Sequence, residues 1–207
     1  MSPTGDNATM KISKHPEYVQ WFNRLRDRRA KARITSRIDR LAQGHWGDVE
    51  PVGEGVKELR IFYGKGYRVY VKKRGQELVV LLYGGHKGTQ QKDIERTGGI
   101  IMAKVELVPF DPAEELDTPE GIAEFLAAAF ETGDSAYIVH AIGVAAKAKG
   151  MTDIAEKTGL NRQSLYRAFS EKGNPQLDTV IKVLGAFGVD LSAKLHQPEN
   201  HHDSHPA

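Results

Sequence analysis

The pattern of residues 151–170 constrains the fold more than any other part of this 207-residue chain. Its apolar positions, including Ile154 and Leu165, recur with the three- and four-residue spacing of two short helices, and Gly159 lies between them. A glycine at that point can adopt the left-handed backbone conformation that a tight turn between helices needs. Asn161 is placed to cap the second helix. These residues predict a helix-turn-helix.

The second helix of this motif carries polar side chains. In a helix-turn-helix on DNA, the first residues of the second helix reach base edges in the major groove. Arginine can donate two hydrogen bonds to guanine, and glutamine can pair with adenine in a similar way. We therefore expect a DNA-reading surface made of Asn161, Arg162, Gln163, Ser164, Tyr166 and Arg167. The alternative interpretation is an ordinary helical hairpin with a solvated polar face.

Charge is divided unevenly along the chain. Residues 1–101 contain 20 Lys and Arg against 11 Asp and Glu, a net +9, whereas residues 102–207 contain 9 against 16, a net −7. The acidic residues are densest in residues 103–134, which contain nine Asp and Glu and one Lys. This split is typical of two modules rather than one uniform domain. A basic module suits a polyanionic partner, and an acidic segment suits binding to the basic module.

Two methionines and a glycine pair mark possible boundaries. Gly98-Gly99 is expected to end the preceding helix, and both Met10 and Met102 resemble starts of translation. The chain is therefore divided into a leader (1–9), a basic domain (10–97), a junction (98–102), an acidic arm (103–134), a helical domain (135–196) and a disordered tail (197–207).

Periodicity predicts an α+β fold for the basic domain. One helix is expected after Pro16, a second from Asp27 to Gly44, and one or two helical turns over Thr89–Arg96. Between them the period changes to two, which predicts an antiparallel sheet. Its three strands are expected at Leu59/Ile61, Tyr67/Val69/Val71 and Leu78/Val80/Leu82. An all-α domain should follow, with helices beginning near Thr118-Pro119 and Ser135.

Residues 111–193 resemble Xre/Cro-type antitoxins, the HigA-like family of addiction-module antidote proteins. The resemblance rests on the stretches Glu115–Glu120, Leu165–Pro175 and Gln176–Leu184. It implies a homodimer that binds operator DNA, represses its own operon and neutralises a cognate toxin.

Residues 12–96 resemble the RelE/ParE superfamily of toxins, specifically the addiction-module killer proteins, through the stretches Glu58–Tyr70 and Tyr83–Ile94. RelE-type toxins cut messenger RNA in the ribosome, whereas ParE-type toxins poison gyrase. Cleaving RNA through its 2′-hydroxyl needs a base, an acid and cations for the phosphate. By the resemblance, Arg68 matches the family's transition-state arginine and Lys87 a further basic position. Arg60 is the candidate phosphate clamp, and His86 is a candidate proton carrier because its pKa can sit near neutrality.

Together these features suggest a toxin and an antitoxin in one chain, with the acidic arm screening Arg60, Arg68 and Lys87 within the chain or on a neighbouring protomer. The alternatives are a helix-turn-helix transcriptional regulator with a catalytically inactive basic domain, and a ParE-like gyrase poison. The chain has no cysteine, which excludes disulfides and thiolate metal sites. No cofactor, metal or membrane partner is expected, and the absence of a long apolar run favours the cytoplasm.

Overall fold

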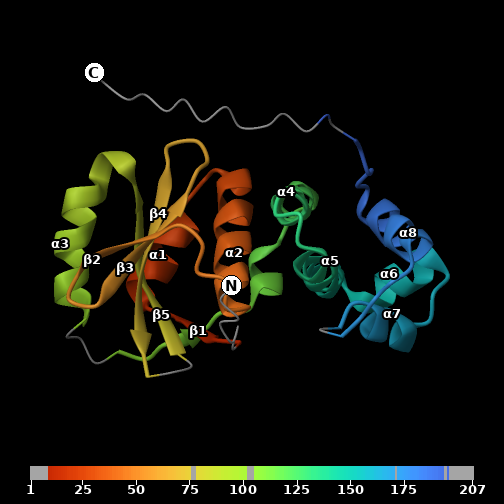
Figure 1. The fold of residues 1–207 in the computed structure, drawn as a ribbon, viewed down its shortest axis with the longest axis horizontal. Coiled ribbons are helices and arrows are strands. Elements are labelled where there is room, and N and C mark those ends of the chain that lie inside the picture. The colour runs from red at the N-terminus through yellow and green to blue at the C-terminus, as the bar shows by residue number, and fades with distance from the viewer. Residues whose placement is uncertain (1–8, 76–77, 102–104, 171, 194, 196–207) are drawn as a thin grey trace, which may run out of the picture.

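The computed structural model describes residues 9–75, 78–101, 105–170, 172–193 and 195. Figure 1 shows a half built around one β-sheet, followed by a half made of helices. None of the helices described is long and apolar enough to cross a membrane. Residues 1–8 of the expected leader, Met102 of the expected junction and the expected tail lie outside the described residues.

The sheet-containing half begins with a short strand, which is followed by two helices. Its elements are β1 (Lys11–Lys14), α1 (Pro16–Arg24), α2 (Arg28–Ala42), β2 (Val49–Gly53), β3 (Val56–Ile61), β4 (Tyr67–Arg74), β5 (Leu78–His86), the 3-10 helix η1 (Lys87–Thr89) and α3 (Gln90–Ile101). The side chains of His15 and Asp27 cap α1 and α2 by accepting hydrogen bonds from backbone N–H groups. The two expected helices are therefore confirmed.

The sheet has six strands in the order β2-β3-β4-β5-β1-β6. The expected antiparallel meander is confirmed as β3, β4 and β5. The expectation of a purely antiparallel sheet is wrong, because β1 pairs in parallel with β5, with Ile12 opposite Val79. β6 (Val108–Pro109) then pairs antiparallel with β1, so a piece of the acidic arm completes the sheet of the basic half.

Helices cover both faces of this sheet. Helices α1 and α2 pack on one face, where Ile34 of α2 and Leu59 of β3 share one core, and α3 packs on the other face through Ile100. Figure 1 shows α3 and α2 on opposite sides of the strands. The expected helix end at Gly98-Gly99 is wrong, because α3 continues through both glycines to Ile101. Thr97 and Ile100, which flank the pair, are buried, so packing offsets the low helix propensity of glycine.

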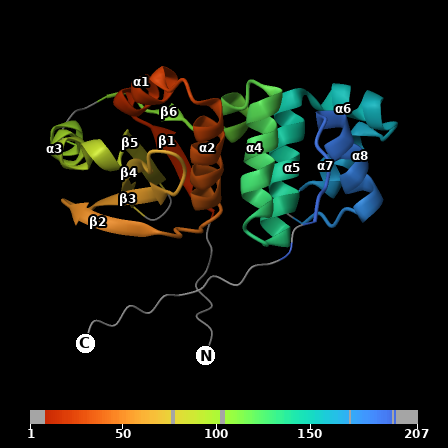
Figure 2. The same ribbon diagram turned by 90° about the horizontal axis from the view of Figure 1, so that it is seen from above.

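The helical half contains η2 (Pro112–Glu115), α4 (Pro119–Phe130), α5 (Ser135–Lys149), α6 (Met151–Thr158), α7 (Arg162–Ala168) and α8 (Leu177–Phe187). Thr118 caps α4 as expected, whereas Asp134 rather than Ser135 caps α5. Seen from above, α4 and α5 lie between α2 and the last three helices (Figure 2).

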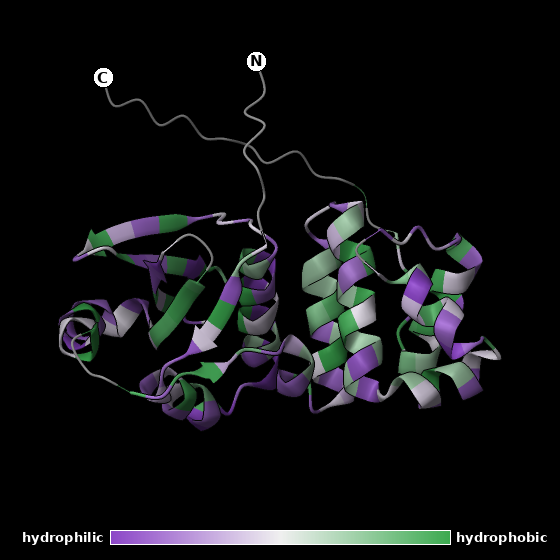
Figure 3. Cartoon of the chain, turned by 90° about the horizontal axis from the view of Figure 1, so that it is seen from below, coloured by the Kyte–Doolittle hydropathy of each residue, from purple (hydrophilic) through white to green (hydrophobic). Residues whose placement is uncertain are grey.

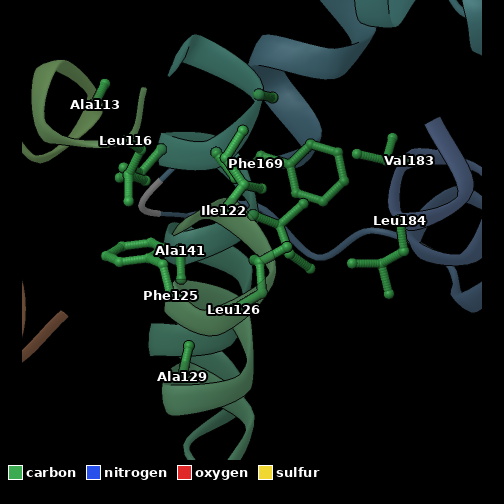
Figure 4. Packing of buried hydrophobic residues seen from close by; sticks show 14 of the residues in the cluster. Ala113, Leu116, Ile122, Phe125, Leu126, Ala129, Ala141, Phe169, Val183 and Leu184 are labelled. Carbon is green, nitrogen blue, oxygen red and sulfur yellow. The ribbon is translucent and has the colours of Figure 1, made fainter. Parts of the chain in front are cut away.

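One hydrophobic core joins the helices of this half. Phe125, Leu126, Phe169 and Leu184 all belong to this core, with Phe125 on the far side of α4 from Phe169 and Leu184 (Figure 4). Ala32 of α2 belongs to the same core, although α2 is part of the basic half. Figure 3 shows that α4 and α5 carry hydrophobic residues over much of their surfaces, as expected for helices with neighbours on two sides. The two halves therefore share an apolar contact along α2.

Candidate functional site

The predicted helix-turn-helix is formed by α6, residues 159–161 and α7. Gly159 has a φ of 69°, the left-handed conformation that the turn requires. The Asn161 Oδ1 accepts a hydrogen bond of 2.8 Å from the backbone N–H of Gln163 and so caps α7. Ile154 and Leu165 are fully buried between the helices. The expected turn and cap are thus both confirmed.

The six residues expected to read DNA are all exposed on and around α7. Between them, Leu165 points inward and holds the helix on α6. Tyr166, half of whose side chain is exposed (52%), also lines a cavity of about 660 Å³ between the two halves. The face of α7 that Arg162, Gln163 and Arg167 occupy is therefore open to a partner.

The four predicted catalytic residues lie toward one end of the sheet. Arg60 and Arg68 are directly paired across β3 and β4. Lys87 follows β5, and its backbone N–H donates to the carbonyl oxygen of Gly66 at 3.0 Å. A Cβ atom built on Gly66 would lie 3.7 Å from both the Arg68 Nη1 and the Lys87 Cβ, so these two basic residues flank one turn. His86 ends β5 immediately before Lys87.

Sequence reasoning gave no role to Glu58, which organises this cluster. Its side chain is fully buried, and its Oε1 lies 2.9 Å from the Arg68 Nε and 3.2 Å from the Arg60 Nε. Its Oε2 accepts a hydrogen bond of 2.9 Å from the Gln90 Nε2 at the start of α3. A buried carboxylate needs such partners to offset the loss of hydration. The two arginines therefore share one carboxylate beneath them, and Arg60 also lies near Asp48 and Glu50, so neither is a free cation.

Asp93 is a second buried carboxylate, located under the end of β5. Burial raises the pKa of its carboxyl, and the hydrogen bond of 2.5 Å from the Thr89 hydroxyl opposes that rise. Gly85 makes room for it, since a Cβ atom at that position would lie only 1.9 Å from the Asp93 Oδ2. Burial and the charge of Glu58 also raise the pKa of the Tyr70 hydroxyl. This face of the sheet thus contains a buried polar cluster that α3 covers.

His86 has a structural contact at one ring nitrogen. Its Nδ1 accepts a hydrogen bond of 3.1 Å from the backbone N–H of Gly88, and so caps η1. In the neutral imidazole this contact puts the proton on Nε2. Only Nε2 is then available to exchange a proton with a substrate.

Ion pairs join the acidic arm to α2 and β1. Arg33 contacts Glu124, and its two terminal nitrogens each lie 2.8 Å from an oxygen of Glu131. These hydrogen bonds raise the pKa of the Arg33 guanidinium. Lys14 of β1 lies 2.6 Å from Glu115. Basic and acidic groups of the two halves therefore meet in a specific geometry. Arg33 donates two parallel hydrogen bonds to the Glu131 carboxylate.

Within one chain, the expected contact of the arm with Arg60, Arg68 and Lys87 is wrong. Among the described residues, the ion pairs that residues 105–134 form with the basic half involve Lys14, Arg33 and His45. None of these ion pairs reaches Arg60, Arg68 or Lys87. The arm packs on α2, whereas the charge-assisted contacts of Arg60 and Arg68 come from their own half.

Polar groups from the next helix continue this contact. The His140 Nε2 on α5 lies 3.0 Å from an oxygen of Asp39, which is almost fully buried on α2. The Tyr137 hydroxyl donates a hydrogen bond of 2.9 Å to the carbonyl oxygen of Ser36.

In the described part of the chain, no three His, Cys, Asp or Glu residues gather in a way suited to holding a metal ion.

Comparison with known proteins identifies the helical half. A family model described as "Probable addiction module antidote protein" matches residues 106–195. One uncharacterized protein of Haemophilus influenzae is 47% identical over 88 residues, which are 42% of this chain and 89% of that protein. A second from the same organism is 35% identical over 89 residues, 43% of this chain and 92% of that protein. No solved structure matches the chain significantly.

The family match spans the acidic arm from residue 106, the helix-turn-helix and α8, and it begins beyond the basic half. Through residues 106–195, the chain belongs to the family of probable addiction module antidote proteins.

Proposed function

We propose that the chain is a cytoplasmic toxin–antitoxin module in one polypeptide. In this proposal the helical half is the antitoxin, which binds operator DNA and represses its own operon. The basic half is a RelE-like toxin that the antitoxin neutralises. The observation that carries the antitoxin role is the exposed polar face of α7 on a capped helix-turn-helix within an antidote-family match.

The proposed DNA contact depends on few cations. The helical half is acidic overall, so favourable interaction with phosphates requires its positive charges to gather near the groove. Arg162 and Arg167 are both exposed on α7, beside Gln163. In this proposal Arg162 and Gln163 form hydrogen bonds with base edges in the major groove. Asn161 and Ser164 contact the phosphate backbone of the DNA. Tyr166 and Arg167 extend the contact on the next turn.

Replacing Arg162 and Gln163 together with alanine is expected to abolish sequence-specific binding to the DNA upstream of the coding region. Each bidentate contact to a base contributes about 1–3 kcal/mol of discrimination, so the double variant should lose roughly 30-fold or more in affinity. Fluorescence anisotropy with the upstream DNA measures the specific affinity, and the same measurement with a scrambled duplex gives the non-specific affinity. Lys149→Ala at the end of α5 is the matched control, because it removes one exposed positive charge from the same half. Equal effects of the two variants would reject a reading role for α7.

We further propose that the antitoxin half forms a homodimer through α8. Leu177 and Ile181 lie one turn apart on this helix and are 67% and 52% exposed, which leaves an apolar strip open to solvent. A two-fold dimer would present two copies of α7 to the two half-sites of a palindromic operator. Ile181→Asp is expected to convert the dimer to a monomer in light scattering and to weaken operator binding. Dimers of unchanged stability in this variant would place the contact elsewhere.

We propose that the basic half acts on RNA, with the ribosome and its messenger as partners. Arg68 would stabilise the phosphate in the transition state, Arg60 would clamp it, and Lys87 would add charge. His86 would carry the proton through Nε2. The support is that Arg60, Arg68 and Lys87 gather around one sheet end beside His86.

One observation favours a second candidate, a regulator whose basic half is inactive. Glu58 contacts both arginines from beneath, so a phosphate must compete with a buried carboxylate for them. RNA sequencing of cells that express a chain with weakened contact between its halves distinguishes the candidates. Cleaved transcripts support the RNA-cleaving toxin and intact transcripts support the regulator. A DNA-damage response with intact transcripts supports a gyrase poison.

A further inference from the structure

A second cavity lies between α2, the edge of β3 and α4. Its volume is about 340 Å³, and four arginines line it. Three of them, Arg33, Arg37 and Arg40, follow one stripe of α2 at four- and three-residue spacing, and Arg60 comes from β3. Its acidic lining residues are Asp48 and Glu131. Positive charge therefore exceeds negative charge around this space.

Two of these arginines are not in direct contact with a carboxylate of the described residues. Neither Arg37 nor Arg40 forms an ion pair with any residue that the structure describes. The Arg40 Nε is buried without a hydrogen-bond partner, and its guanidinium lies 5.9 Å from the centre of the Tyr137 ring. Arg37 instead donates to the backbone carbonyl oxygens of Trp46 and Asp48. Both arginines are partly withdrawn from water, where an anionic partner stabilises a cation, so this stripe is suited to binding an anion.

The electrostatics of Arg37 agree with this geometry. Burial, and then repulsion from Arg40, lower the pKa of the Arg37 guanidinium to about 10, and attraction to Asp48 opposes that fall. A bound anion between the two side chains would remove that repulsion. Arg33 already forms a bidentate pair with the Glu131 carboxylate, the same arrangement that arginine forms with phosphate.

An aromatic ring stands at the same cavity. Phe62, in the loop between β3 and β4, is 80% exposed and lines the space with the arginines. Leaving such a ring in water is unfavourable, and exposed aromatic rings beside cationic grooves are platforms on which nucleic-acid bases stack. The ligand that satisfies both features has a phosphate for the guanidinium groups and a flat base for the ring.

We propose that this cavity binds a nucleotide, either free or at the end of an RNA strand, with its phosphate at Arg37 and Arg40 and its base on Phe62. The site adjoins the buried cluster around Glu58 without including Glu58 or Arg68. Arg60 lines the cavity and also contacts Glu58, but the proposed phosphate ligands here are Arg37 and Arg40. Binding at these two residues requires neither RNA cleavage nor operator binding, so its failure would leave the proposed function standing.

Isothermal titration calorimetry on the intact chain tests the inference with ADP, GDP, pyrophosphate, adenosine and a short single-stranded RNA. The nucleoside diphosphates are expected to bind, pyrophosphate to bind more weakly, and adenosine to show no heat. Arg40→Gln should weaken ADP binding at least 10-fold, because a hydrogen bond to a charged group is lost. Phe62→Ala should reduce the affinity for ADP to that for pyrophosphate, because only the stacking contribution disappears.

Arg29→Gln is the matched control, since Arg29 is exposed on the same helix and carries the same charge. Arg40→Lys keeps the positive charge but loses the bidentate donor geometry of the guanidinium, so an intermediate affinity for ADP is expected. Phe62 is exposed, so its variant tests the site even where changes at Arg40 disturb folding. Binding of RNA alone, sensitive to Arg40, would assign the site to a strand end. The inference is overturned by absence of binding at millimolar ligand, or by equal affinities of the Arg40→Gln and Arg29→Gln chains.

Discussion

Replacing Glu58 with alanine is expected to lower the free energy of unfolding of the basic half by about 3–5 kcal/mol. The Glu58 side chain is fully buried, and that of Arg68 is only 11% exposed. Without the carboxylate, the Arg68 guanidinium stays buried with no countercharge, and Gln90 loses its acceptor. Urea denaturation followed by tryptophan fluorescence measures the loss, because both tryptophans, Trp21 and Trp46, lie in the basic half.

Two comparisons isolate the cause. Glu50→Ala removes an exposed carboxylate that also lies near Arg60, and a loss below about 1 kcal/mol is expected there. A double variant, Glu58→Leu with Arg68→Met, replaces the pair with apolar groups and should be more stable than Glu58→Ala alone. Equal stability of the Glu58→Ala and Glu50→Ala chains would show that Glu58 is not the electrostatic centre of this face.

The elements that local rules specify could be predicted from the sequence. The turn at Gly159 and the caps at Asp27, Thr118 and Asn161 depend on residues within three positions of each other. The meander of β3, β4 and β5 follows from short turns and alternating apolar residues. The exposure of the α7 surface follows in turn, because one buried residue, Leu165, fixes which side of that helix faces inward.

The pairings between distant segments could not be predicted in this way. β1 is four residues long and joins β5 across 67 positions of sequence, and β6 reaches it from the acidic arm. Helix α3 passes through Gly98-Gly99 because its last turns pack on apolar residues of the sheet such as Val56 and Val80, which only the folded sheet reveals. The run Val79–Leu82 is buried on both sides, so period-two alternation could not show which face it presents.

The candidate site in the basic half was only partly predictable for a related reason. Alternation along β3 puts Glu58 on the same face as Arg60, so the sequence contained the signal. Glu58 acquires its importance because α3 covers that face and excludes water. Similarly, charge complementarity predicted that the acidic arm would meet the basic half, but not where. Many basic surfaces of this half could attract an acidic segment. The arm binds α2 because Ala32 of that helix also makes an apolar contact with the helical core.

Reversing the charge of Arg33 is expected to separate the two halves. Arg33 and Glu124 are largely buried, with side chains 22% and 16% exposed, and Glu131 is held by two further contacts of 2.8 Å. Arg33→Glu would place three carboxylates together, a change expected to weaken the contact by about 3 kcal/mol or more. Hydrogen exchange of α2 and α4 should then accelerate roughly 100-fold, since 1.4 kcal/mol corresponds to a factor of ten.

The same variant tests whether this contact neutralises a toxin. If it does, cells that express the Arg33→Glu chain should stop growing and accumulate cleaved transcripts, because the basic half is released. Arg29→Glu, a charge reversal at an exposed position of the same helix, should have neither effect. Adding Glu124→Arg and Glu131→Arg to Arg33→Glu restores opposite charges and should restore protection and growth. Adding Arg68→Ala instead should leave exchange fast but remove the RNA cleavage, which separates catalysis from instability. Fast exchange with intact transcripts would reject the RNA-cleaving toxin, and unchanged exchange would show that Arg33 does not hold the halves together.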